Sequence, residues 1–147
     1  ADRTSFVALE EALAHVRNIS KPVLLEINYA YNGSDTDLSQ LEKFLRPPYR
    51  ADVIISMHSS LVYPLMAHLN RRKLRVPQDI AIISMEDGIG FDLMLSPVTS
   101  LRKPLPGMAI KVANMIWSEV KNSGKGKFRR QFNITPELVV RSSCGTI

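Results

Sequence analysis

Two stretches of the chain are hydrophobic without regular polar alternation, Ala51–Met57 (ADVIISM) and Asp79–Met85 (DIAIISM). Such runs are typical of parallel strands that are covered on both faces. Two further apolar runs, Pro22–Asn28 (PVLLEIN) and the shorter Glu137–Arg141 (ELVVR), also read as strands. The pattern therefore predicts four strands.

Apolar residues recur at helical spacing in four other segments, which are Ser5–Arg17, Thr36–Leu45, Ser60–Arg72 and about Gly107–Lys121. Helix and strand alternate through residue 87, which predicts right-handed βαβ crossovers. We therefore expect an α/β fold with an open parallel sheet and flanking helices, in three α/β/α layers. Pro97 and Pro104 bracket VTSLRK, which we interpret as an extended crossover.

Composition narrows the class of protein. The chain has 147 residues, the size of one domain, and no run of about 18 apolar residues that would predict a membrane span. Its single cysteine, Cys144, leaves no intramolecular disulfide, so we expect a reducing, cytoplasmic setting. The net charge is +5, but the basic run Lys121–Phe132 is better explained as a solvated loop than as a nucleic-acid site.

Polar side chains follow three of the predicted strands. They are Asn28-Tyr29, with Tyr31 close behind, then His58-Ser59, and finally Glu86-Asp87. Because ligands of open α/β sheets bind beyond the carboxyl ends of the strands, we expect these groups to converge on one rim. Amide, phenol, imidazole, hydroxyl and carboxylate groups suit a polyhydroxylated or heterocyclic small molecule. The alternatives are that either carboxylate caps a turn and that His58 is a structural residue.

The sequence favours binding over catalysis. It contains no Gly-rich phosphate loop and no Gly-x-Ser-x-Gly turn, and its three histidines are too scattered to propose a metal. Glu86 and Asp87 are neighbours in sequence, whereas a two-carboxylate hydrolase needs facing groups at a defined separation. We therefore expect no enzyme, no cofactor and no metal.

Four stretches together resemble the effector-binding part of the LacI/GalR family of transcriptional regulators. They are ADVIISMHSSLVYPLMAHLN, LRVPQDIAIISMED, SPVTSLRKPLPGMAIKVANMIW and TPELVVRSS, and they cover some 90 residues, with residues 1–50 matching more loosely. The resemblance implies the periplasmic-binding-protein-like fold and a module that senses a small molecule. A periplasmic sugar-binding protein of related fold is the alternative.

Several binding residues follow from this resemblance. Glu86 falls where the family commonly has an effector-binding aspartate, and Asp87 matches the second acidic position. His58-Ser59 replaces an Asn/Ser-Asp pair, which puts the inherited hydrogen bonds in doubt. The family's effector-binding arginine before the first helix corresponds to Arg3, and its aromatic residue after the first strand corresponds to Tyr29, with Tyr31 as the alternative.

The resemblance also implies partners. Residues 1–147 would form a single domain, mainly the C-terminal lobe, with a second lobe and a DNA-binding headpiece outside this chain. The helix at about 105–121 would normally pack on that second lobe, so here we expect it to dock on its own lobe or on a second copy. The resemblance also implies a homodimer formed partly by Val62, Tyr63 and Met66. The apolar segment around Phe91 and Met94 predicts either part of that interface or local core.

Overall fold

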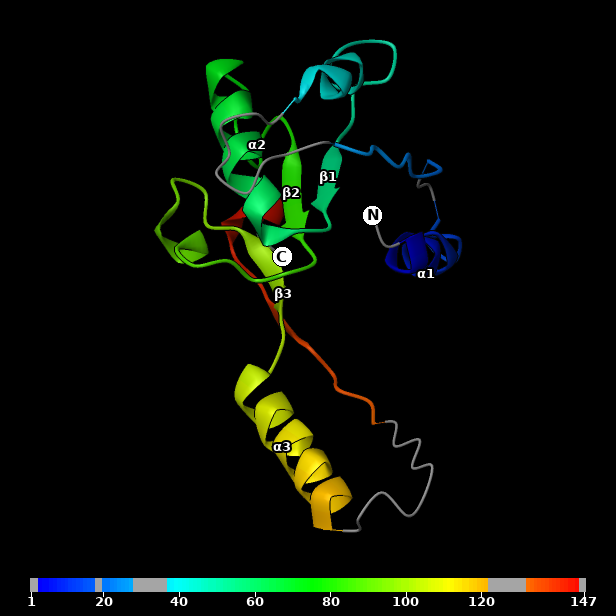
Figure 1. Ribbon diagram of the computed structural model, residues 1–147. Coiled ribbons are helices and arrows are strands. Elements are labelled where there is room, and N and C mark those ends of the chain that lie inside the picture. The colour runs from blue at the N-terminus through cyan, green and yellow to red at the C-terminus, as the bar shows by residue number, and fades with distance from the viewer. Residues whose placement is uncertain (1–2, 18–19, 28–36, 122–131, 146–147) are drawn as a thin grey trace.

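Four strands form one mixed sheet in the order β1-β2-β3-β4 (Figure 1). The computed structural model describes residues 3–17, 20–27, 37–121 and 132–145. The strands are β1 Val53–Ser56, β2 Ala81–Ser84, β3 Thr99–Arg102 and β4 Glu137–Val139. β1 pairs with β2 and β2 with β3 in parallel, whereas β3 pairs with β4 antiparallel. The predicted open α/β sheet with parallel central strands is confirmed, and its antiparallel edge strand was not foreseen.

Two details of the strand prediction are corrected. Residues 20–27 contain no strand, although Pro22–Asn28 was expected to form one, and Leu25 only packs against the core; residue 28 lies outside the described ranges. The segment VTSLRK, interpreted as a crossover, contains β3. Its sequence hid the strand because Thr99 and Ser100 are polar yet buried, and the partners that satisfy them lie far along the chain.

Three of the four segments with helical spacing form α-helices, although the first was expected at Ser5–Arg17 and ends at Leu13. They are α1 Arg3–Leu13, α2 Ser59–Arg71 and α3 Leu105–Lys121, with short 3-10 turns η1 Ser39–Phe44, η2 Phe91–Leu93 and η3 Ser142–Cys144. The segment expected to be helical at 36–45 forms only the 3-10 turn η1 within its described part. None of the helices in the described ranges has the length and apolar character to cross a lipid bilayer.

The core lies between α2 and the sheet. Its buried side chains are Leu41, Val62, Leu65, Leu69, Ile80, Ile82, Phe91 and Val98. Gly88 allows the Phe91 ring to approach, since a Cβ at Gly88 would lie only 2.4 Å from that ring. Val62 and Phe91 are both 0% exposed, so Phe91 follows the local-core alternative, and neither side chain offers surface to a partner.

Helix α3 extends away from the sheet (Figure 1). It buries none of its residues, and Leu105, Ile110, Ile116, Trp117 and Val120 are each at least 60% exposed. The expectation that this helix docks on its own lobe is therefore wrong for this structure. Its apolar face is uncovered by the described residues, which leaves a second copy or a second lobe as the expected cover.

Candidate functional site

Strands β1 and β2 end in the same way and in register. Ser56 pairs with Ser84 across the two strands, and both side chains are almost completely buried. The Ser56 hydroxyl donates to the carbonyl of His58 at 2.8 Å, and the Ser84 hydroxyl donates to the carbonyl of Glu86 at 2.7 Å. Each serine thus turns the chain two residues beyond itself, which places the two strand tips side by side.

Glu86 joins the two tips through its side chain. Its Oε2 accepts the backbone N–H of Ser59 at 3.3 Å and lies 3.7 Å from Nδ1 of His58. Ser59 is the first residue of α2, so Glu86 satisfies a free N–H at the positive end of that helix. Of the predicted binding residues, the structure therefore brings together His58, Ser59 and Glu86.

The second oxygen of Glu86 has a different partner. Lys103, directly after β3, donates from Nζ to Oε1 at 2.9 Å. Burial by itself raises the pKa of the Glu86 carboxyl, but the Lys103 ammonium and the Ser59 N–H outweigh it and lower the pKa below its ordinary value. Glu86 is therefore a charged acceptor at neutral pH, with its side chain one-third exposed.

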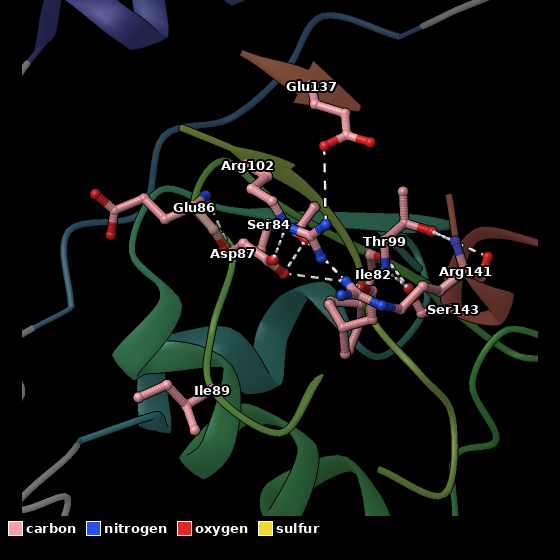
Figure 2. A network of polar contacts seen from close by, with 12 residues as sticks. Ile82, Ser84, Glu86, Asp87, Ile89, Thr99, Arg102, Glu137, Arg141 and Ser143 are labelled. Carbon is pink, nitrogen blue, oxygen red and sulfur yellow. Dashed lines mark hydrogen bonds and ion pairs between the residues drawn. The ribbon is translucent and has the colours of Figure 1, made fainter. Parts of the chain in front are cut away.

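Asp87 faces the sheet, and its carboxylate accepts hydrogen bonds from side chains of this lobe. Ser100 donates to its Oδ1 at 2.6 Å, Arg141 donates to the same oxygen at 3.1 Å, and Arg102 donates to Oδ2 at 2.8 Å. Burial would raise the pKa of this carboxyl, but the three hydrogen bonds dominate and lower it to about 2. Figure 2 shows the Glu86 carboxylate pointing away from this network. The two adjacent acids thus have separate surroundings, and only Glu86 faces outward.

The end of the chain completes the network around Asp87 (Figure 2). The Thr99 hydroxyl donates to the carbonyl of Arg141 at 3.0 Å and accepts the Arg141 N–H at 2.9 Å. The Ser143 hydroxyl donates to the carbonyl of Ile82 at 2.6 Å and accepts the Thr99 N–H at 2.9 Å. The segment 141–143 therefore joins β3 to β2 through these hydrogen bonds, next to Asp87.

One other predicted binding residue, Arg3, is not brought to this rim. Arg3 begins α1, which lies apart from the sheet in Figure 1, and Arg3 is exposed. Tyr29, like Asn28 and Tyr31, lies outside the described residues. Among the described residues, the rim is built from the tips of β1 and β2 and the end of β3.

Sequence reasoning missed Lys103 and Arg102, which follow each other at the end of β3 and contact Glu86 and Asp87 respectively. The sequence did contain a signal, since two acids follow β2 and two bases lie at the end of β3. It was overlooked because VTSLRK was not interpreted as a strand.

The rim suits reversible binding by hydrogen bonds. It offers a carboxylate acceptor, an imidazole, an ammonium donor and a helix N-terminus on an open edge. Within the described ranges, no group of three acidic, histidine or cysteine side chains has the geometry for a metal ion. A shallow hollow of about 160 Å³ lies elsewhere, lined by Glu42, Leu45, Arg46, Arg72 and Leu74.

A second surface, beside η2, is apolar. Ile89, Leu93 and Leu95 are 97%, 86% and 98% exposed. Tyr63 of α2 lies next to them, because its hydroxyl donates to the carbonyl of Ile89 at 2.6 Å. Met66 and Met94, both predicted interface residues, are half-buried against the core. We call Tyr63, Ile89, Leu93 and Leu95 the η2 surface.

Residues 5–144 match the model of the periplasmic binding protein-like domain. The chain is 21% identical over 142 residues to an HTH-type transcriptional repressor PurR from Vibrio parahaemolyticus, covering 93% of this chain and 42% of that protein. The chain spans only about a third to two-fifths of the length of the curated relatives it matches.

Solved structures share the fold. The transcription regulator CcpA of Lactococcus lactis superposes with a TM-score of 0.70 at 21% identity, over 94% of this chain and 49% of that one. A LacI family transcriptional regulator from Lactobacillus casei with bound sucrose superposes with a TM-score of 0.66 at 18% identity, over 95% of this chain and 49% of that one.

Proposed function

The chain belongs to the periplasmic-binding-protein-like domain family, and on that premise we propose that it is the effector-sensing lobe of a LacI-type transcriptional regulator. The observation that carries this proposal is the meeting of Glu86, His58 and Ser59 at the carboxyl ends of two neighbouring parallel strands. This is the edge at which open α/β sheets bind their ligands.

The effector is a sugar-like or nucleobase-like small molecule. Glu86 accepts a hydroxyl or N–H of the ligand, and His58 and Ser59 supply further polar contacts. A related regulator with bound sucrose supports the sugar class. A second lobe would supply the facing half of the cleft. Arg3, Tyr29 and Asp87 of this chain remain predicted effector contacts.

The module senses and does not catalyse. Effector binding between two lobes shifts the equilibrium between open and closed arrangements, and a homodimer transmits that shift to DNA-binding headpieces on the operator. The η2 surface, together with Met66 and Met94, is the proposed dimer contact. The curated relatives are transcriptional repressors, which favours a cytoplasmic regulator over a periplasmic sugar-binding protein.

Calorimetric titration of the full-length protein, which includes the second lobe, with sucrose, glucose, adenine and hypoxanthine tests the proposal. We expect one class of ligand to bind and the Glu86→Gln variant to bind it at least about tenfold more weakly, because a charged acceptor is lost. Glu11→Gln, an exposed acid on α1, is the matched control and should bind normally. Binding to none of these ligands, or equal binding by both variants, contradicts the assignment.

A further inference from the structure

The end of β2 is joined to the end of β3 by two adjacent ion pairs. Glu86 pairs with Lys103 at 2.9 Å, and Asp87 pairs with Arg102 at 2.8 Å. Lys103 is followed by Pro104, and α3 begins at Leu105. Only one residue therefore separates the partner of Glu86 from the helix that leaves this lobe.

The two pairs differ in how firmly they are held. Asp87 has three donors, and one of them, Arg141, has a side chain only 12% exposed. Glu86 and Lys103 have side chains 33% and 52% exposed, and Lys103 has no second acceptor among the described residues. Exposed pairs contribute little and are easily exchanged for other partners. The ion pair of Asp87 with Arg102 is thus held firmly, whereas a competing donor can replace Lys103 in the ion pair with Glu86.

We propose that Lys103 is a positioning residue: its ion pair with Glu86 holds the start of α3 against the tip of β2, and loss of that pair frees the start of α3. The assignment of Glu86 as the effector's acceptor rests on the proposed function. If Glu86 is that acceptor, a ligand hydroxyl or N–H that donates to its Oε1 displaces the Lys103 ammonium from this oxygen. Effector binding would thereby release the crossover between β3 and α3 without moving the sheet.

The neighbouring contacts confine this effect to the crossover. Arg102 also lies 3.8 Å from Glu137 at the start of β4. Strand β4 therefore stays linked to Asp87 through Arg102 when a ligand occupies Glu86. Leu105 donates its N–H to the carbonyl of Lys103 at 2.8 Å, so the first turn of α3 moves with Lys103.

Amide hydrogen exchange of the ligand-free chain tests the proposal. In Glu86→Gln and Lys103→Met, we expect peptides spanning residues 103–108 to exchange roughly two- to fivefold faster, the scale of one exposed ion pair. Peptides from β2 and from residues 137–141 should not change. Lys103→Arg should restore slow exchange, and so should the charge swap Glu86→Lys with Lys103→Glu. Lys73→Met, an exposed lysine in the turn after α2, is the control and should match the wild type.

Three results would overturn the positioning role. They are wild-type exchange in Lys103→Met, fast exchange in the charge swap, and acceleration spread equally over the sheet. The swap also separates this inference from the proposed function, since it restores the ion pair but moves the carboxylate from the tip of β2 to the end of β3. Slow exchange in the swap together with effector binding as tight as that of the wild type would retain the ion-pair role and contradict the effector assignment of Glu86.

Discussion

Arg141 donates from Nη1 to Oδ1 of Asp87 at 3.1 Å, although 54 residues separate them in the chain. The same nitrogen donates to the carbonyl of Val98 at 2.6 Å and to the Ser100 hydroxyl at 3.0 Å. This guanidinium therefore connects the end of β2, the start of β3 and the C-terminal segment. Asp87, the neighbour of the candidate effector-binding residue Glu86, is therefore held in place by Arg141, which lies close to the end of the chain.

Replacing Arg141 with methionine should lower the free energy of unfolding by about 2–3 kcal/mol, because Asp87 and a backbone carbonyl lose a mostly buried charged donor. Arg102→Met is the matched control at the same carboxylate. The Arg102 side chain is 47% exposed, and its loss should cost about 1 kcal/mol or less. Urea denaturation measures both, and equal costs would contradict the central role of Arg141.

The low pKa of Asp87 predicts an acid-dependent loss of stability. Its folded pKa of about 2 lies below the ordinary 3.8, so its stabilising contribution is full above about pH 4 and disappears as the pH falls through about 2. After allowance for partial exposure, the contribution is about 1–2 kcal/mol. Asp79, whose pKa is also about 2 through its hydrogen bonds with Arg75, adds to the same loss.

Urea denaturation at pH 5 and pH 3 tests this contribution. Asp87→Asn should be less stable than the wild type at pH 5, and the difference should narrow at pH 3, with Asp79 maintaining part of the slope. Asp92→Asn, an exposed acid in η2, serves as the control. A wild-type slope in Asp87→Asn would show that this carboxylate does not carry the effect.

Two adjacent serines offer a second test of the network. Ser143 is completely buried, and its hydroxyl donates to the Ile82 carbonyl and accepts the Thr99 N–H. Ser143→Ala therefore removes the hydrogen-bond partner of both backbone groups. We expect a loss of about 2–3 kcal/mol. Ser142 is exposed, and Ser142→Ala should stay within about 0.5 kcal/mol of the wild type. Thermal or urea unfolding compares them, and similar stabilities would argue against the Ser143 contacts.

The sequence was informative where local pattern decides structure. Apolar periodicity predicted α2 and α3, and the uninterrupted apolar runs predicted β1 and β2. It was uninformative where distant residues decide. Strand β3 is recognisable only once Arg141 and Asp87 are known to accept hydrogen bonds from its Thr99 and Ser100 hydroxyls, and Ser143 from the Thr99 backbone N–H.

The candidate site shows the same division. The rule that ligands bind at strand ends placed His58-Ser59 beside Glu86, because both strands are parallel and end in register. The rule could not separate the roles of Glu86 and Asp87. Those roles depend on which way each side chain turns, and on Lys103, Arg102 and Arg141, whose positions require the folded chain.

The η2 surface is the proposed contact between two copies of this chain. Exposing a leucine to water forgoes about 1.5–3 kcal/mol, so the nearly bare Leu93 and Leu95 favour a covered state. Replacing both with aspartate should weaken the dimer at least about tenfold, as measured by sedimentation velocity across a concentration series, while circular dichroism stays unchanged. Phe91→Asp is the contrasting variant: Phe91 is completely buried against Gly88, so we expect unfolding rather than dissociation. An undiminished dimer in the double variant would place the contact elsewhere, with the uncovered face of α3 as the next surface to test.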